Sequence, residues 1–181
     1  MSFQDVMPAL LPIENVWSNT PGDRGGETVY GISIVSNPKS PVWPFVRQFQ
    51  AAKIPLQEWI RSAPFMAAVF STYKANYWDP CQLDYFPPNL QQAAFGCAVN
   101  EGIEKMAKLL QIALIRVGQT VAQDGQIGPM TLKAINAAPA GWLEDAFKLA
   151  RAEDYLEIAN RDPKEQAQFL RGWGNRLKQG L

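Results

Sequence analysis

The chain contains no histidine and only two cysteines among its 181 residues. Enzymes that cleave amide bonds in cell walls usually depend on a histidine-ligated zinc ion or on a cysteine activated by a histidine base. Neither site can be built without histidine. Hydrolysis through carboxyl groups remains available, and we expect no metal ion and no other cofactor.

The chain also lacks an excess of charge and a long apolar run. Seventeen basic and seventeen acidic side chains leave no net charge, so nothing indicates a nucleic-acid partner. The apolar runs are far shorter than a membrane span needs, and residues 1–5 do not begin a basic segment followed by an apolar one. We expect no nucleic-acid partner, no membrane span and no cleavable export signal.

The two cysteines allow one disulfide bridge or two free thiols. Cys97 lies in a helical, alanine-rich stretch, where a small buried thiol is the simpler interpretation. We therefore favour free thiols over a bridge.

The first carboxyl group of interest is that of Glu14. Apolar residues follow one another at the spacing of a buried helix face, namely Phe3, Val6, Met7 and Leu10, and Glu14 continues this stripe by one turn. A carboxyl group in a partly apolar place acquires the raised pKa that a general acid needs. The alternative is a solvated glutamate at a helix end, which describes most glutamates.

A glycine-rich segment follows Glu14 and contains Asp23 and Thr28. Its glycines permit positive φ angles and favour a tight hairpin folded back over Glu14, an arrangement that no core requirement explains. A glycosidase needs a protonated acid and an ionised second carboxylate. Asp23 fits the second role, although it also fits a plain turn residue, and Glu27 and Asp84 are alternative second carboxylates.

These residues form a pattern of Glu, eight residues, Asp, a Gly-Gly pair and then Thr-x-x-Gly-Ile-Ser. It resembles glycoside hydrolase family 108, the N-acetylmuramidases of phage and bacterial wall lysis. Further matches follow in the family's order: Tyr77-Trp78-Asp79, Leu83-Asp84 with Pro87, Ala98-Val99-Asn100, Leu110-Gln111, Asp124-Gly125 through Thr131, and Gly172-Trp173 with Asn175-Arg176. The resemblance thus covers nearly the whole chain.

The resemblance implies a mainly α, lysozyme-like helical domain with a small β-hairpin beside the active site. It implies hydrolysis of the β-1,4 bond between N-acetylmuramic acid and N-acetylglucosamine, with Glu14 as general acid and Asp23 and Thr28 as its catalytic partners. The expected partners are the glycan strands of peptidoglycan. A chain made in the cytoplasm without a cleavable signal would then reach the wall by release or by assisted export.

Two departures from the family pattern leave a second function open. Glu-Gly-Gly-Tyr at the acid is replaced by Glu14-Asn15-Val16-Trp17, and Asp-Pro-Gly-Gly by Asp23-Arg24-Gly25-Gly26. Valine is a poor substitute where a positive φ is needed, and Arg24 adds a cation near the expected carboxylates. The alternative is a non-catalytic peptidoglycan-binding or secretion-accessory protein with a degenerate site.

A second motif runs from Gln111 through Asp124-Gly125-Gln126-Ile127-Gly128-Pro129. It resembles the peptidoglycan-binding motif of many wall enzymes. The alternative is purely structural, because a tight Asp-Gly turn followed by proline at the first helical position also seats one helix against another.

Aromatic rings with a polar edge suit the faces of hexoses, and we take Tyr30, Tyr77 and Trp78 as candidate substrate contacts. Trp17, Tyr73 and Tyr85 are further candidates, and core packing is the alternative for each ring. Asn100 lies in a helical apolar stretch, where its side chain needs a partner. It is expected to hold a turn or the substrate by hydrogen bonds.

The apolar periodicity predicts a hairpin within residues 27–35 and helices at 43–52, 55–61, 64–77, 129–137, 141–159 and 164–178. It also predicts one long helix from about residue 89 to 117, with Asn100 approaching the cleft. Because that helix carries more apolar surface than the later part alone can cover, we predict a single compact domain over residues 1–181. The family-level division would place a muramidase region in 1–88 and a peptidoglycan-binding-like helical region in 89–181.

Overall fold

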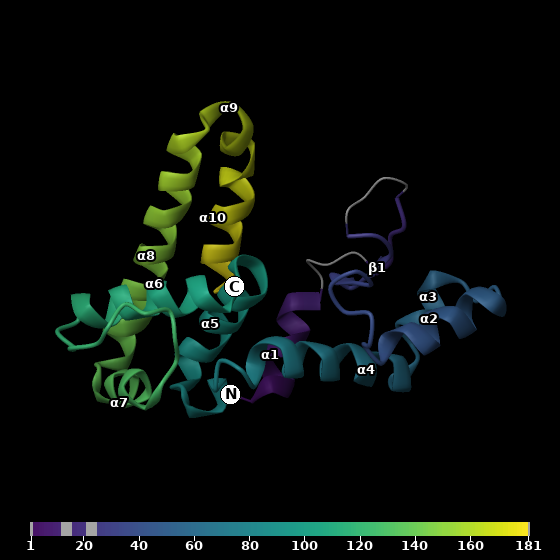
Figure 1. Cartoon of the computed structure of the whole chain (residues 1–181), viewed down its shortest axis with the longest axis horizontal. Coiled ribbons are helices and arrows are strands. Elements are labelled where there is room, and N and C mark those ends of the chain that lie inside the picture. The colour runs from purple at the N-terminus through teal and green to yellow at the C-terminus, as the bar shows by residue number, and fades with distance from the viewer. Residues whose placement is uncertain (1, 12–15, 21–24, 181) are drawn as a thin grey trace. The chain divides into compact units, whose positions relative to one another are not determined.

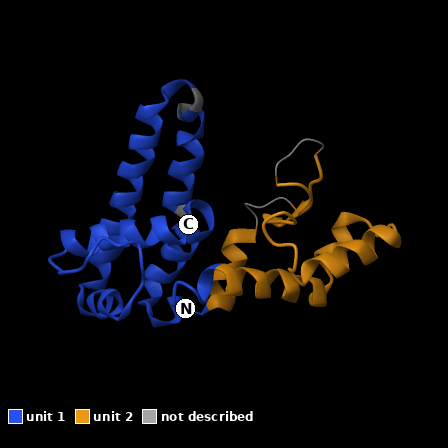
Figure 2. Cartoon of the chain, in the orientation of Figure 1, with its two compact units in different colours: residues 1–2, 77–181 blue, residues 3–76 orange. Residues whose placement is uncertain are grey.

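The computed structural model describes residues 2–11, 16–20 and 25–180. Within these residues the chain is mainly helical, with one small antiparallel sheet (Figure 1). The chain divides into two compact units (Figure 2). We call residues 3–76 the N-terminal unit, and residues 77–181 together with residues 1–2 the C-terminal unit.

The N-terminal unit contains four α-helices and a hairpin in its described part: α1 (Phe3–Leu10), β1 (Thr28–Val29), β2 (Ile32–Ser33), α2 (Val42–Ala51), α3 (Leu56–Trp59) and α4 (Ala63–Tyr73). All four residues of the predicted apolar stripe on α1 are buried. An aromatic cluster forms the core, because the ring of Phe49 lies 5.3 Å from that of Trp59 and 5.5 Å from that of Phe65. Ser62 caps α4 by accepting the backbone N–H of Phe65.

The predicted hairpin is confirmed. Thr28 pairs with Ser33 and Val29 with Ile32, which leaves a two-residue turn at Tyr30 and Gly31. Both turn residues have positive φ, 45° and 71°, as the tightest hairpin turns require. The hydroxyl group of Tyr73 on α4 donates to the backbone oxygen of Tyr30 at 2.7 Å and so fixes the turn on the core.

The C-terminal unit is a helical bundle. The π-helix η2 (Lys74–Trp78) leads into it, and there follow η3 (Leu83–Tyr85), α5 (Pro88–Glu101), α6 (Ile103–Arg116), α7 (Pro129–Ala137), α8 (Ala140–Arg161), α9 (Pro163–Gln166), η4 (Ala167–Phe169) and α10 (Leu170–Gln179). Helix α8 packs against α5 and α6, and α10 runs back along α8 (Figure 1). The rings of Tyr155 and Trp173 stack between α8 and α10 with centroids 4.9 Å apart.

The prediction of one helix from residue 89 to 117 is wrong. Helix α5 ends at Glu101 and α6 begins at Ile103, because Gly102 between them has φ 91° and ψ 156°. This conformation lies outside the helical region and suits a residue without Cβ. Other boundaries differ too: the helix predicted at 55–61 is only the four residues of α3, α4 passes into a π-helix at Lys74, and the predicted helix 164–178 is divided among α9, η4 and α10. The single domain over residues 1–181 stays a prediction.

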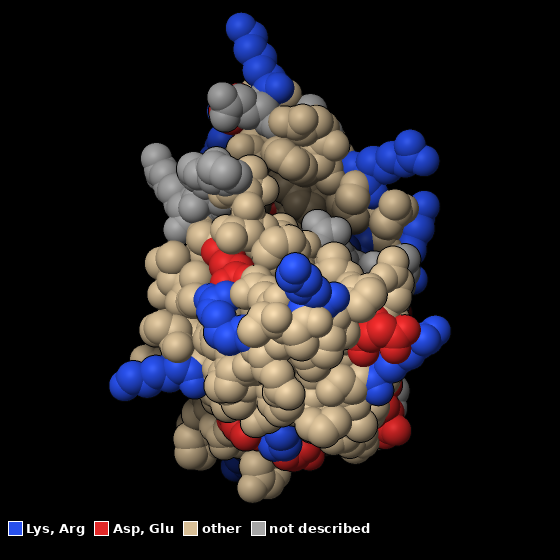
Figure 3. All heavy atoms as spheres, turned by 90° about the vertical axis from the view of Figure 1, so that its right-hand side faces the viewer, with Lys and Arg blue, Asp and Glu red and all other residues tan. Residues whose placement is uncertain are grey.

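The fold is mainly α and lysozyme-like, with one small hairpin, as expected from the sequence. Among the described residues, no helix combines the length and the apolar character that a bilayer span requires. Both cysteines are free and buried, and burial raises the pKa of Cys81 to about 12. One face of the molecule carries scattered acidic and basic side chains, several of them next to one another, on a largely uncharged surface (Figure 3).

Candidate functional site

The predicted acid Glu14 and its predicted partner Asp23 lie outside the described residues, but the segments next to them are described. Ser18 and Thr28 form an antiparallel bridge with two backbone hydrogen bonds of 2.9 Å, and the N–H of Tyr30 donates to the oxygen of Val16 at 3.2 Å. The segment that follows Glu14 in the sequence therefore runs alongside β1. This pairing brings it next to Thr28, the third predicted catalytic residue.

Glu27, directly before β1, is a buried carboxylate. Its Oε1 accepts the indole N–H of Trp17 at 2.8 Å and the amide of Gln50 at 2.7 Å, and its Oε2 lies 2.5 Å from Arg47. Burial alone would raise the pKa of Glu27, but the hydrogen bonds from Trp17, Arg47 and Gln50 outweigh it and hold the pKa below the ordinary value. Glu27 is therefore an ionised carboxylate whose two oxygens both have partners, and it anchors the hairpin to α2 and to Trp17.

Arg47 and Gln50 are the partners that sequence reasoning missed. The signal was present, because the two residues lie three apart on α2 and so share one helix face. The sequence alone does not show that this face of α2 pairs with the hairpin.

Thr28 and Tyr30 occupy the hairpin in different ways. Thr28 is half-buried, and its hydroxyl group donates to the oxygen of Gly26 at 3.3 Å. The side chain of Tyr30 is buried, and its ring packs against Phe65 with centroids 6.4 Å apart. Tyr30 thus offers no exposed ring to a sugar and acts as a core residue.

The other three predicted substrate contacts lie in the C-terminal unit. Trp78 is completely buried, packs on Phe95 at 5.5 Å and donates its indole N–H to Asp84 at 2.9 Å. A ring with no exposed surface cannot face a glycan, so Trp78 is also a core residue. Tyr77 is half-buried, and Asn100 is exposed at the end of α5 with its amide 3.3 Å from the hydroxyl group of Tyr155.

The second motif forms one hydrogen-bonded loop. Buried Gln111 donates to the carboxylate of Asp124 at 2.7 Å and to the backbone oxygen of Gln126 at 3.0 Å, and accepts the N–H of Gly125 at 2.9 Å. Asp124 further accepts the N–H of Gln126 at 2.9 Å. These bonds hold the loop between α6 and α7. They give the motif the structural role that was one of its two interpretations from the sequence.

A buried ion pair inside the C-terminal unit was not expected. Arg151 has no exposed surface, and its guanidinium donates to Oε1 of Glu101 at 2.9 Å and to the hydroxyl group of Tyr155 at 3.0 Å. Tyr155 in turn donates to the same oxygen at 2.7 Å. The sequence did contain a signal for this pair. Arg151 lies between Phe147 and Tyr155 at a spacing of four residues, and an arginine on such an apolar helix face indicates a buried charge that needs a partner.

Across the described ranges, no three acidic or cysteine side chains are grouped as a metal site would need.

Two family profiles match the sequence of this chain. The profile described as Glycosyl hydrolase 108 covers residues 7–102, and the one described as Predicted Peptidoglycan domain covers residues 105–178. The chain belongs to glycosyl hydrolase family 108. The family makes it a glycoside hydrolase that acts on peptidoglycan, as the resemblance implied.

A solved structure, titled Structure of Brucella abortus SagA, shares the fold. It is 24% identical, with a TM-score of 0.65, and the match covers 98% of this chain and 90% of that chain. At this identity the likeness concerns the fold alone. The comparison with curated proteins gave no significant match.

Proposed function

We propose that this family 108 hydrolase cleaves the β-1,4 bond between N-acetylmuramic acid and N-acetylglucosamine, with Glu14 as general acid. Asp23 stabilises the positive charge that develops on the sugar or steers the attacking water, and Thr28 helps to orient that water. Asn100 and Tyr77 are the proposed substrate contacts, because the side chain of Asn100 is exposed and that of Tyr77 is half-buried.

The observation that carries the proposal is the pairing of residues 16–18 with β1. Through the bridge between Ser18 and Thr28, the hairpin is tied to the segment that begins two residues after Glu14. A glycosidase requires its carboxyl groups to flank one bond at a separation below about 10 Å, so the segments that carry them must be held together. The backbone bridge joins residues 16–18 to Thr28 and Tyr30, and this pairing next to the two segments supports the proposal.

The charge arrangement of the hairpin supports Asp23 over Glu27 as the second carboxylate. Glu27 is held by Trp17, Gln50 and Arg47, so it has no free oxygen for a substrate or a water. Asp84 is occupied on one oxygen by Trp78. Asp23 therefore remains the proposed partner of Glu14.

Digestion of purified peptidoglycan with the wild type and with Glu14→Gln tests the proposal, with Glu58→Gln on the exposed surface as the matched control. The glutamine is isosteric but cannot protonate the leaving oxygen, so we expect a loss of about 10² to 10⁴ in rate with unchanged melting temperature. The control should keep full activity. Activity of Glu14→Gln within about tenfold of the wild type would remove Glu14 from the mechanism.

The mass of the products separates the alternatives. Hydrolysis gives reducing muramic acid ends, and a lytic transglycosylase, which uses the same acid without a water nucleophile, gives anhydro ends. A wall-binding protein with a degenerate site releases nothing from the same substrate.

A further inference from the structure

The N-terminal unit contains a cavity of about 410 Å³ between the loop that follows β2 and the end of α4. Residues within 36–41 line one side of it, and residues within 71–76, where α4 passes into the π-helix η2, line the other. A space of this size is typical of sites for small molecules. All of its lining residues belong to the N-terminal unit, which also contains the hairpin.

Side-chain hydrogen bonds hold the two walls of this cavity together. The hydroxyl groups of Ser40 and Thr72 lie 2.7 Å apart, and the amide of Asn76 donates to the side-chain oxygen of Asn37 at 2.6 Å. The backbone oxygen of Asn37 also accepts the indole N–H of Trp43 at 2.7 Å. The walls are therefore fixed before any ligand enters, which lowers the entropy cost of binding.

The pair of Asn37 and Asn76 leaves one donor and one acceptor open. The bond between the two side chains uses the NH2 group of Asn76 and the oxygen of Asn37. Among the described residues, the NH2 group of Asn37 and the side-chain oxygen of Asn76 have no partner. Turning both amides over would exchange the two roles and still leave one donor and one acceptor. Both side chains are half-buried and line the cavity, so a ligand can reach them.

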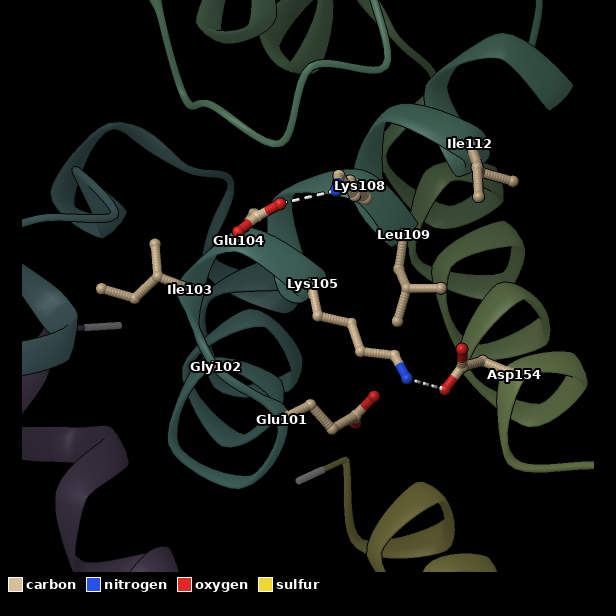
Figure 4. Close-up of a pocket in the computed structure, with 9 residues that line it drawn as sticks. All are labelled: Glu101, Gly102, Ile103, Glu104, Lys105, Lys108, Leu109, Ile112 and Asp154. Atoms are coloured by element: carbon tan, nitrogen blue, oxygen red, sulfur yellow. Dashed lines mark hydrogen bonds and ion pairs between the residues drawn. The ribbon is translucent and has the colours of Figure 1, made fainter. Parts of the chain in front are cut away.

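A larger cavity of about 640 Å³, at the junction of α5 and α6, differs in this respect (Figure 4). Its lysines are already paired, Lys105 with Asp154 and Lys108 with Glu104, each at 2.6 Å. Of these two cavities, the one in the N-terminal unit therefore has the better case for a ligand.

The chemistry of the open groups defines the ligand. A donor and an acceptor side by side match the oxygen and the N–H of a secondary amide, such as the acetamido group of an N-acetylated sugar. Ser71 adds an exposed hydroxyl group, and Pro41 and Ala75 add apolar surface for the acetamido methyl group. Lys39 is the one charged side chain among the described residues that line the cavity. The ammonium group of a diamino acid thus finds no carboxylate there, whereas a neutral sugar needs none.

The π-helix is a second sign of function at this cavity. It covers Lys74–Trp78 and contains both Ala75 and Asn76. Such helices are rare, and they occur frequently at functional sites. The wider turn places Asn76 opposite the loop that carries Asn37.

Two contacts connect the cavity to the hairpin. The N–H of Asn37 donates to the backbone oxygen of Ser33 on β2 at 2.8 Å. On the other wall, Tyr73 follows Thr72 directly and donates to the backbone oxygen of Tyr30 in the hairpin turn. A group held in the cavity is therefore held beside the hairpin that carries Thr28.

We propose that this cavity, which we call the Asn37–Asn76 site, binds the acetamido group of one N-acetylated sugar of the glycan strand. The NH2 group of Asn37 donates to the acetamido oxygen, and the side-chain oxygen of Asn76 accepts the acetamido N–H. The proposal rests on the proposed function for its choice of polymer, and it adds the contacts by which an acetylated strand is told from a sugar that has a hydroxyl group in place of the acetamide.

Titration of the full-length protein with N,N′-diacetylchitobiose, followed by amide chemical shifts, tests the site. Cellobiose has hydroxyl groups in place of both acetamides and is the matched probe, and the tripeptide L-alanyl-γ-D-glutamyl-L-lysine is the peptide probe. We expect diacetylchitobiose to shift residues 36–41 and 71–76, and cellobiose to bind there about tenfold more weakly because two hydrogen bonds are lost. The tripeptide should leave these residues unshifted.

Two kinds of variant test the contacts. Asn76→Ala should raise the Kd of diacetylchitobiose by about tenfold, whereas Asn160→Ala, on the exposed surface of α8, should bind like the wild type. Ala75→Leu narrows the cavity without removing a side-chain hydrogen bond, so it should weaken binding by about tenfold or more even if Asn76→Ala fails to fold. Ala51→Leu, at an exposed position in α2, is its matched control and should bind normally.

The proposal is overturned if cellobiose binds as tightly as diacetylchitobiose, if the tripeptide shifts residues 36–41 and 71–76, or if Ala75→Leu binds as Ala51→Leu does. Neither disaccharide contains a bond to muramic acid, so their binding does not depend on catalysis. Full wall hydrolysis by Glu14→Gln, with diacetylchitobiose binding intact, would overturn the proposed role of Glu14 and leave the Asn37–Asn76 site in place.

Discussion

The indole N–H of Trp17 donates to the buried carboxylate of Glu27 at 2.8 Å. The bond joins the segment that follows Glu14 in the sequence to the base of the hairpin, next to the backbone bridge between Ser18 and Thr28. Arg47 and Gln50 of α2 hold the same carboxylate from the other side. One side chain thus ties the hairpin, the preceding segment and α2 together.

Removal of the Glu27 charge should destabilise the protein. In Glu27→Gln the side chain keeps one acceptor oxygen and no charge, so its NH2 group must face either Arg47 or the donors Trp17 and Gln50. Hydrogen bonds to a charged group contribute about 1.5–3 kcal/mol, and we expect the free energy of unfolding in urea to fall by this amount. Glu58→Gln breaks the exposed pair with Arg61 and should change it by less than about 1 kcal/mol. Equal effects of the two variants would show that Glu27 is no anchor.

The same carboxylate predicts a pH dependence. The folded-state pKa of Glu27 lies below the ordinary value of 4.5, so its contribution to stability is fully present above that value and is lost as the pH falls through the folded-state pKa. The melting temperatures of the wild type and Glu27→Gln should therefore differ most near neutral pH and converge in acid. A difference that grows on acidification would contradict the lowered pKa.

The proposed partners of Glu14 should affect turnover more than binding. Asp23→Asn should lower kcat by about 10²-fold with little change in KM, because it removes an interaction made mainly in the transition state. Thr28→Ala should lower kcat more mildly, and Thr28→Ser, which keeps the hydroxyl group, should restore most of it. If Asp23→Asn lowers the melting temperature and leaves kcat unchanged, Asp23 is a turn residue only.

Local patterns predicted much of the fold but not its long-range pairings. The stripe from Phe3 to Leu10, the hairpin and the proline-started helix α7 follow from periodicity and turn chemistry, which act over a few residues. The break at Gly102 was missed because alanine and leucine on both sides favour a continuous helix, whereas the glycine there adopts a positive φ. Gln50, which binds Glu27, and Glu101, which binds Arg151, come from elements far away in the sequence, so no local pattern could name these partners.

The aromatic residues illustrate the same limit. A ring that could face a sugar and a ring that fills a core have the same sequence signature, and only burial separates them. Tyr30 and Trp78 are in the core, whereas Tyr85 is exposed.

Two glycines allow backbone strain and crowding to be measured separately. Gly125 and Gly118 both have positive φ, 74° and 86°, but a Cβ at 125 would overlap Glu104 while one at 118 would meet nothing within 4 Å. Gly118→Ala should cost about 1–2 kcal/mol of unfolding free energy for the backbone alone. Gly125→Ala should cost about 1–3 kcal/mol more, because Glu104 and Lys108 must move. Equal losses in the two variants would show that the loop does not press on α6.

The last prediction concerns cooperativity and the place where the chain can be divided. We expect the full chain to unfold in a single calorimetric transition, and two separate transitions would contradict the single domain.

A fragment of residues 77–181 should retain helical structure and melt cooperatively. A fragment of residues 89–181 lacks Trp78 and Leu83, which are completely buried, with Trp78 packed on Phe95. Loss of one such buried aromatic side chain typically costs about 3–5 kcal/mol, so the shorter fragment should be much less stable in urea than the longer one. Equal stability of the two fragments would mean that residues 77–88 are no part of the C-terminal core, and that the family-level boundary at 88 is also the physical one.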